Sequence, residues 1–261
     1  MRRPIVILLS IMVAAALCAT GTVGYLAFLR PADHAPSDVC AAPATRPRVV
    51  AAGASMTQGS LGADWVAALR AAHPAYEFVN AGDNGDTSAG LRERVDADIV
   101  ACRPTAVTLL IGSNDVRDGV PPERYRANLR AIVDRVKDAT GARIALMSLP
   151  PLGEKLGTGI NRTLTGYNAA VKEVAAQTGV TYLPLHERMA DLLRQGPRTS
   201  YGFSFPLAFT VAAEHYLLRR TWDEIARAGG RELLVDHLHL TDRGGAIVTD
   251  LSTRWLNGLE P

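Results

Sequence analysis

Between residues 48 and 184 the chain alternates short apolar runs with longer stretches in which apolar positions recur every three or four residues. The apolar runs predict buried strands over 48–52, 77–80, 105–111, 143–149 and 181–184. The longer stretches predict helices over 64–73, 88–101, 122–140 and 165–178, with a last helix over about 241–256. Strand–helix alternation of this kind implies an α/β fold in which helices cover both faces of a parallel sheet.

The segment 186–234 interrupts this alternation. It holds an aromatic stretch over 201–209, followed by a helical pattern over about 210–228. Connections this long inside a compact domain are usually functional or disordered, and the aromatic content argues against disorder. We therefore expect an insertion that forms a lid or wall of a substrate site, with Phe203, Phe205 and Phe209 as candidate lining residues. A pair of helices packed on the edge of the sheet is the alternative.

The N-terminus has a different character from the rest of the chain. Arg2 and Arg3 precede a run without charged residues over 4–29, which Arg30 closes. About 20 apolar residues span a bilayer as a helix, whereas the apolar region of a signal peptide has only about 7–15. Residues 1–30 therefore predict a single-pass transmembrane anchor, and the two arginines predict a cytoplasmic N-terminus with an extracytoplasmic catalytic domain. The alternative is a signal peptide cleaved near 16–19, which would give a secreted protein.

Two cysteines bear on the segment after the anchor. Residues 31–47 are rich in proline and alanine, which predicts an extended linker to a domain over 48–261. Cys40 and Cys102 form an even pair in a compartment that permits disulfides. A bridge between them would add about 4 kcal/mol to the free energy of unfolding on the chain-entropy treatment. Two unpaired thiols are the alternative, because spacing alone does not fix the geometry.

The composition limits the classes of function. Of 261 residues, 48% are hydrophobic and 21% are charged, and the formal net charge is +2. These values fit a globular domain with a full core. The nearly balanced charge, without a basic stripe, argues against nucleic-acid binding. His34, His73, His186 and His215 are scattered without the spacing of metal ligands, so we expect no metal site.

Polar residues and glycines follow three predicted strands in turn. Ser55 follows the first strand, Gly82 and Gly85 follow the second, and Asn114 follows the third. Ligands of open α/β sheets bind at the carboxyl ends of the strands, so we expect these residues at one edge. There a serine hydroxyl can act as a nucleophile, and glycine N–H and asparagine amide groups can stabilise an oxyanion. Each residue alone is equally typical of a turn or a helix cap.

The sequence Asp-His-Leu-His at 236–239, just before the last predicted helix, is more specific. Asp236 can fix the tautomer of the His239 ring while the other ring nitrogen faces a serine. His237 is interpreted as a neighbour without a catalytic role. Together with Ser55, these side chains make a complete set for acyl transfer, which needs no metal or organic cofactor.

In order and content, these clusters resemble the SGNH (GDSL-like) hydrolase superfamily over about residues 48–256. The resemblance implies a three-layer α/β/α sandwich with a five-stranded parallel sheet, a flavodoxin-like arrangement. It also implies the catalytic set. Ser55 would be the nucleophile and one backbone donor to the oxyanion, Gly85 the second backbone donor, and Asn114 the side-chain amide donor. Asp236 and His239 would be the acid and the base.

Two details of the resemblance concern single residues. Gly85 is preferred to Gly82 as an oxyanion donor, because the run 80–87 is similar to the family's N-x-x-x-x-G-D-T form. Ala54 replaces the acid of the family's usual Gly-Asp-Ser block. This departure bears on substrate preference or loop rigidity more than on catalysis.

The sequence thus predicts an exported, membrane-anchored serine esterase or lipase-like hydrolase that cleaves carboxylic esters through an acyl-enzyme on Ser55. Its expected partners are a small-molecule, lipid or glycan ester and the membrane around the N-terminal helix. One alternative is an O-acyltransferase or deacetylase acting on cell-envelope carbohydrate, because some members of the superfamily have these activities. Another is a non-catalytic binding module, against which the complete set of site residues argues.

Overall fold

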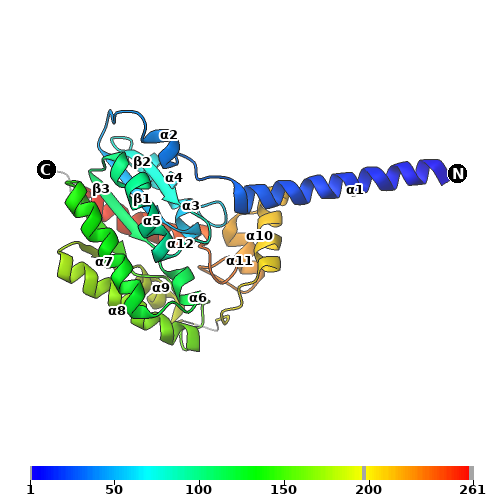
Figure 1. The fold of residues 1–261 in the computed structure, drawn as a ribbon. Helices are drawn as coiled ribbons and strands as arrows, with labels where there is room; N and C mark the ends of the chain where they lie inside the picture. Colours follow the sequence, from blue (N-terminus) through cyan, green and yellow to red (C-terminus); the bar gives the residue numbers. More distant parts are fainter. Residues whose placement is uncertain (1, 196–197, 259–261) are drawn as a thin grey trace.

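The computed structural model describes residues 2–195 and 198–258. Its centre is a five-stranded parallel sheet in the order β2-β1-β3-β4-β5 (Figure 1). In chain order the strands are β1 Arg48–Gly53, β2 Glu77–Gly82, β3 Ala106–Leu110, β4 Arg143–Met147 and β5 Thr181–Leu183. β1 and β3 are buried along their whole length, as expected for parallel strands that are covered on both faces. The predicted fold class is confirmed.

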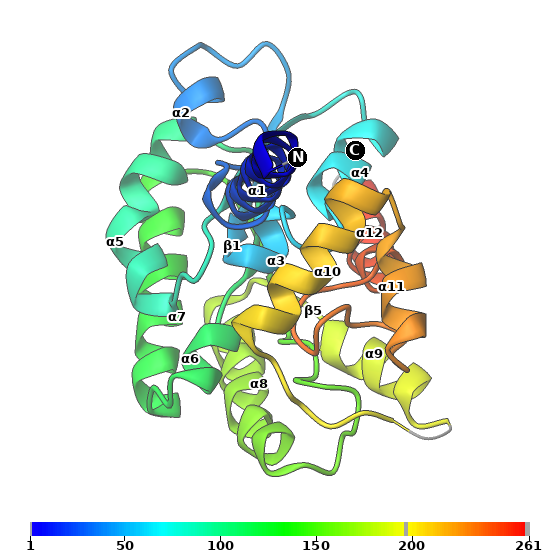
Figure 2. The ribbon, with the colours of Figure 1, turned by 90° about the vertical axis from the view of Figure 1, so that its right-hand side faces the viewer.

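Helices form a layer on each side of the sheet (Figure 2). One layer contains α5 Ser88–Asp98, α7 Pro122–Ala139 and α8 Gly159–Thr178. The other contains α4 Trp65–Ala72, α9 Leu185–Leu193 and α12 Asp242–Asn257. Two short helices, α3 Ser55–Gln58 and α6 Ser113–Arg117, begin just after β1 and β3. The chain thus turns into a helix at the carboxyl end of each of these central strands.

The start of α8 differs from its prediction. The apolar pattern indicated a beginning near residue 165, whereas the helix begins at Gly159. Its first buried side chain is Asn161, which accepts from the N–H of Leu152 at 2.9 Å and donates to the carbonyl of the same residue at 2.9 Å. The first turn is therefore held by polar contacts, which apolar periodicity does not detect.

The segment 186–234 is mostly helical. Besides α9, it contains α10 Phe205–Leu218 and α11 Trp222–Ala228. The single helical pattern predicted over 210–228 is broken at Arg219, whose φ of 54° is left-handed, and Thr221 starts α11 with a capping box. α10 begins within the aromatic stretch, because the Ser204 hydroxyl caps it by accepting the N–H of Leu207.

The N-terminal helix leaves the domain as a long rod (Figure 1). It consists of α1 Arg2–Gly24 and a π-helical end, η1 Tyr25–Leu29. Over Ile5–Leu29 it is long and apolar enough to cross a membrane. Most of its side chains are exposed, but Val23 and Ala27 near its end are buried against α10 and its neighbours. The rod is therefore joined to the rest of the chain by packing as well as by sequence.

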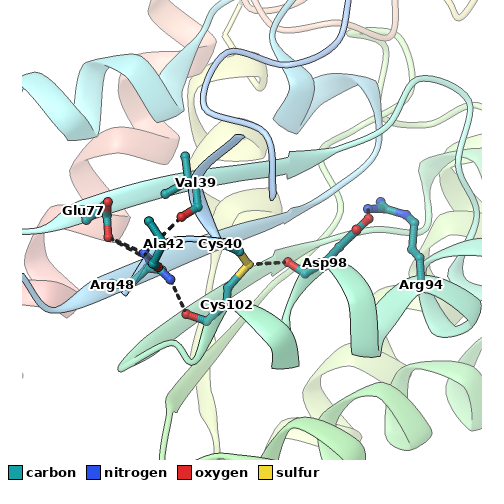
Figure 3. Close-up of a disulfide and its surroundings, with 8 residues drawn as sticks. All are labelled: Val39, Cys40, Ala42, Arg48, Glu77, Arg94, Asp98 and Cys102. Carbon is teal, nitrogen blue, oxygen red and sulfur yellow. Dashed lines mark hydrogen bonds and ion pairs between the residues drawn. A yellow bond between two sulfur atoms is a disulfide. The ribbon is translucent and has the colours of Figure 1, made fainter. Parts of the chain in front are cut away.

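Residues 31–47 differ from the predicted extended linker. They include a short helix, α2 Pro36–Val39, and the N–H of Asn80 donates to the carbonyl of His34 at 3.0 Å. Cys40 and Cys102, 62 residues apart, form a disulfide (Figure 3). On the chain-entropy treatment this loop adds about 4 kcal/mol to the free energy of unfolding. The segment is therefore fastened to the domain.

Arg48 completes this attachment from the first residue of β1 (Figure 3). Its buried guanidinium donates to the carbonyls of Cys102, Val39 and Ala42 at 2.8, 3.3 and 3.2 Å. It also pairs with Glu77 on β2 at 2.8 Å. A buried charge is tolerated only where it finds such partners. The side chain thus joins two strands to the segment that holds the disulfide.

Candidate active site

Ser55 lies at the carboxyl end of β1, as the first residue of α3. Gly53 permits the tight turn before it, because a Cβ at Gly53 would lie 2.3 Å from both the carbonyl oxygen of Leu110 and Oγ1 of Thr57. At the first position of a helix, the N–H of Ser55 has no intrahelical acceptor. The hydroxyl and the N–H of one residue are therefore both available at the edge of the sheet.

Asp236 and His239 approach Ser55 from the loop before α12. Nε2 of His239 lies 2.9 Å from Oγ of Ser55, and Nδ1 lies 2.7 Å from Oδ2 of Asp236. With the proton on Nδ1 donated to the carboxylate, Nε2 is left to accept from the serine hydroxyl. His237 between them has a left-handed φ of 74°, which turns the chain between the acid and the base.

The surroundings of the Asp236 carboxylate favour its ionised form. It is fully buried, and its Oδ1 accepts the N–H groups of Leu238 and His239 at 3.1 and 2.8 Å. Burial alone would raise the pKa of Asp236, but the His239 ring and these backbone N–H groups together hold that pKa below its ordinary value. The carboxylate therefore stays ionised beside the ring and can stabilise an imidazolium.

The structure separates the roles of the two glycines that follow β2. Gly85 lines the same pocket as Ser55, and within the described residues its N–H has no acceptor. The N–H of Gly82 already donates to Oδ1 of Asn80 at 3.0 Å, and a Cβ at Gly82 would lie 2.2 Å from the backbone nitrogen of Gln58. Gly82 thus allows β2 to pack on α3, whereas Gly85 has the free N–H that an oxyanion requires.

Asn114 lines the pocket from the first turn of α6, just after β3. Its Nδ2 donates to the carbonyl of Asp86 at 2.7 Å, and a side-chain amide has a second N–H for a ligand. The adjacent Asp115 is fully buried and accepts both the N–H and the hydroxyl of Ser88, at 2.9 and 2.5 Å. These bonds hold the loops after β2 and β3 together, which fixes Asn114 relative to Gly85.

A pocket of about 250 Å³ opens beside Ser55 and His239. Phe203 and Phe205 line it, and the Phe203 ring packs edge-on against the His239 ring with 5.9 Å between centroids. Phe209, the third predicted lining residue, lies on α10 and packs instead against an apolar cluster that includes Ala27 and Trp222. Within the described ranges, no group of three or more His, Cys, Asp or Glu is placed to hold a metal ion.

Several lining residues were not identified from the sequence, and three of them change the character of the pocket. Arg117 at the end of α6 lies 5.8 Å from the centre of the Phe203 ring and adds a positive charge to the pocket. Ala27 and Phe28 come from η1, the end of the N-terminal helix. Their apolar character was a visible signal, but it was assigned to the membrane-spanning run. No local pattern marks Arg117.

Glu154 is a positioning residue that was also not identified from the sequence. It is fully buried in the segment after β4, and its Oε1 accepts three successive backbone N–H groups, from Glu232, Leu233 and Leu234, at 2.8, 2.6 and 3.0 Å. This carboxylate holds the chain just before Asp236. Because its partners are backbone groups, no pattern of residue types in the sequence predicts the contact.

The geometry is that of a serine hydrolase built on the carboxyl edge of a parallel sheet. The chain belongs to the GDSL-like lipase/acylhydrolase family, whose match covers residues 51–247. It is accordingly a serine-dependent carboxylic ester hydrolase of the SGNH type, as the sequence predicted.

Two curated relatives are similar over part of the chain. The "Esterase TesA" of Pseudomonas aeruginosa is 37% identical over 93 residues, which cover 33% of this chain and 46% of that protein. The match therefore spans about half the length of this relative. The "Acetylxylan esterase" of Geobacillus stearothermophilus is 27% identical over 152 residues, which cover 52% of this chain and 69% of that protein.

Solved structures share the fold. Axe2, an acetylxylan esterase from Geobacillus stearothermophilus, superposes with a TM-score of 0.60 at 22% identity, covering 80% of this chain and 93% of Axe2. The acetyl xylan esterase AlAXEase gives a TM-score of 0.61 at 16% identity, covering 80% of this chain and 99% of that chain. At these identities the likeness concerns the architecture.

Proposed function

We propose that Ser55 is the nucleophile of this ester hydrolase. Its Oγ attacks the ester carbonyl while Nε2 of His239 takes the hydroxyl proton and passes it to the leaving alcohol. Asp236 stabilises the imidazolium formed between these steps. Water, activated by the same ring, then attacks the acyl-enzyme and releases the carboxylic acid. The N–H groups of Ser55 and Gly85 and the amide of Asn114 donate to the oxyanion.

The observation that carries this proposal is the line of hydrogen bonds from Asp236 through His239 to Ser55, at 2.7 and 2.9 Å. A serine far away in the sequence meets an acid–base pair at bonding distance, beside a mainly apolar pocket. A turn or capping serine needs neither a histidine nor a buried carboxylate. The arrangement is therefore suited to acyl transfer.

We also propose that the protein is held in a membrane by the N-terminal helix, with the catalytic domain exported. Arg2 and Arg3 on the N-terminal side and the apolar span Ile5–Leu29 support this orientation. The disulfide between Cys40 and Cys102 suits an oxidising compartment. Cleavage of a signal peptide near 16–19 is the competing outcome, and the mass of the mature protein distinguishes the two.

A second candidate function is removal of acetyl groups from carbohydrate. Two observations favour it: a relative named as an acetylxylan esterase, and a pocket of about 250 Å³, which is below the range of about 300–1,000 Å³ that is usual for drug-sized ligands. Release of acetate from acetylated xylan, compared with hydrolysis of simple esters, separates this function from a lipase-like one. An acyl product on an added glycan would indicate acyl transfer.

The test is ester hydrolysis by the purified full-length chain in detergent, with p-nitrophenyl esters of increasing acyl length. We expect hydrolysis by the wild type and a loss of at least about a thousandfold in Ser55→Ala. Ser113→Ala is the matched control, because Ser113 follows β3 at the same edge and, within the described residues, its hydroxyl has no hydrogen-bond partner. A folded Ser55→Ala protein that hydrolyses esters as fast as the wild type would refute the assignment.

A further inference from the structure

Exposed apolar side chains are concentrated on one part of the catalytic domain. Outside α1 and η1, the described residues include four large hydrophobic side chains that are exposed, Phe205, Leu217, Leu218 and Leu192, at 71%, 49%, 67% and 38%. All but Leu192 belong to α10. Exposed apolar groups gathered on one element usually mark an interaction surface.

The composition of α10 supports this interpretation. Its 14 residues include one acid, Glu214, and no lysine or arginine. Glu214 is paired with Arg220, which lies just beyond the end of the helix. The charged group of α10 therefore has its partner within the chain, while Leu217 and Leu218 extend into solvent.

α10 also lies at the membrane end of the domain. Figures 1 and 2 show it beside the inner end of α1, on the face from which that helix leaves. Val23 and Ala27 of the N-terminal helix pack in one apolar cluster with Ala208, Val211 and other residues of α10. An exposed apolar surface that adjoins the end of a membrane span is at the depth of the interface between lipid and water.

The end of the N-terminal helix is fastened to the catalytic loops as well. The hydroxyl of Ser60 donates to the carbonyl of Ala27 at 2.9 Å, and Nδ2 of Asn84 donates to the carbonyl of Phe28 at 3.1 Å. Ser60 comes from the loop after α3, and Asn84 directly precedes Gly85. The last carbonyls of a helix need such donors, and here the loops beside Ser55 supply them.

The two membrane-end elements both border the catalytic pocket. Ala27 and Phe28 of η1 form one part of its wall, and Phe205 at the start of α10 forms another. A side chain that is 71% exposed and also lines the pocket places the pocket's mouth at the exposed apolar surface. An acyl chain that extends from Ser55 along this wall therefore reaches the exposed apolar surface of α10, beside the end of the membrane span.

We propose that the exposed apolar face of α10 docks on the bilayer that holds α1, so that the catalytic pocket opens onto the membrane surface and takes an amphiphilic ester whose acyl chain comes from that bilayer. This inference depends on the proposed function for the role of Ser55, but the docking itself does not. It also accounts for the small pocket, because only the part of the chain near the ester needs to enter it.

Lipid fits this surface better than a second copy of the chain. The bilayer is already present wherever α1 spans it, and α10, which bears the exposed side chains, packs with its buried face against Val23 and Ala27 at the end of that span. No separate partner has to be recruited. A dimer formed through α10 is the outcome that would replace the proposal.

Docking is tested with the full chain incorporated in lipid nanodiscs large enough to hold two copies. Leu218→Trp places a fluorophore on α10, and Leu192→Trp places one on the remaining exposed apolar position as the matched control. Lipids brominated near the headgroup end of the acyl chain should quench the added Leu218→Trp fluorescence, and the Leu192→Trp signal should stay unquenched. Wild-type fluorescence is subtracted to remove the native tryptophans. Equal quenching at both positions, or at neither, would overturn the proposal, and a dimer held through α10 would give none.

The substrate class is tested in the same discs. Leu217→Ser combined with Leu218→Ser should lower hydrolysis of a long-acyl ester dissolved in the disc lipid by about tenfold, because apolar contact with lipid is lost. Hydrolysis of a water-soluble acetyl ester should not change, and Leu192→Ser should change neither rate. An equal loss on both esters, or no loss on the lipid ester, would overturn the inference. Persistent hydrolysis by Ser55→Ala would instead refute the proposed function and leave the quenching result standing.

Discussion

The carboxyl edge of the sheet and the junction between the N-terminal helix and α10 are built in different ways. At the edge of the sheet, short polar contacts position a few residues, such as Nε2 of His239 at 2.9 Å from Oγ of Ser55. At the junction, apolar side chains from the N-terminal helix and α10 pack together. The first region defines the reaction, and the second borders the pocket in which it occurs. The predicted reaction residues and the apolar wall of the pocket thus come from separate segments of the chain.

The largest expected effect lies at the carboxyl edge of the sheet. Asp236→Asn keeps the shape of the side chain but cannot hold the His239 ring in the required tautomer, so kcat should fall by about 10⁴-fold. Steady-state kinetics on a short soluble ester measures this loss. A change of less than tenfold in a folded variant would show that Asp236 does not orient the base.

The same residue gives an expectation about acid stability. The pKa of Asp236 is held below its ordinary value in the folded protein, so its carboxylate stabilises the fold above that value. This contribution should be complete above about pH 5 and be lost as the pH falls through the lower folded value. Urea unfolding of the wild type and of Asp236→Asn between neutral and acidic pH measures it. Their difference in unfolding free energy should shrink on acidification, and a difference that grows would contradict this account.

A smaller kinetic loss is expected for the amide donor. Asn114→Ala removes one hydrogen bond to the oxyanion and should lower kcat by about 10²–10³-fold, with little change in KM. Asn128→Ala is a useful comparison, because Asn128 bonds the hydroxyl of Ser88 behind the site without lining the pocket. Equal losses in the two variants would assign Asn114 a structural role.

The disulfide should affect stability rather than chemistry. Replacing Cys40 and Cys102 by serine opens a loop of 62 residues and should lower the free energy of unfolding by up to about 4 kcal/mol. Cys18→Ser is the control, because Cys18 is exposed on α1 and unbridged. Thermal unfolding of the full chain measures the effect, and equal midpoints for all variants would show that the segment 31–47 is not fastened by the bridge.

The mildest kinetic loss is expected at the end of the N-terminal helix, which forms part of the pocket wall. Phe28→Ala removes a side chain from the pocket wall, so KM for a medium-acyl ester should rise by about tenfold with kcat nearly unchanged. Leu29→Ala alters the adjacent residue, which is exposed and lies outside this pocket. If the two variants have the same KM, the end of the N-terminal helix does not contribute to acyl binding.

The sequence was informative where a function needs particular residue types in a local order. Buried parallel strands have continuous apolar runs, and a catalytic acid and base three residues apart form a recognisable group, so the sheet and the set of candidate residues could be predicted. The choice of Gly85 over Gly82 came from family resemblance, and the structure supplies a physical reason for it: the N–H of Gly82 is already bonded to Asn80.

Features that depend on contacts between distant segments were not predictable in this way. Glu154 acts on backbone N–H groups nearly eighty residues later, and the Arg48 side chain is buried by carbonyls of a segment that looked like a spacer. The break in the predicted helix at Arg219 depends on one left-handed residue that is not glycine. The role of Ala27 and Phe28 as part of the pocket wall was not recognised, because the apolar run that contains them was interpreted as a membrane span.

Covalent labelling of the full-length chain by a fluorophosphonate, followed by mass spectrometry of its peptides, tests directly whether Ser55 is the nucleophile. A serine activated by His239 and Asp236 should carry the phosphonate on Ser55, and Ser55→Ala and His239→Ala should not be labelled. Labelling of Ser55→Ala at the wild-type level, with the adduct on another residue, would contradict the account.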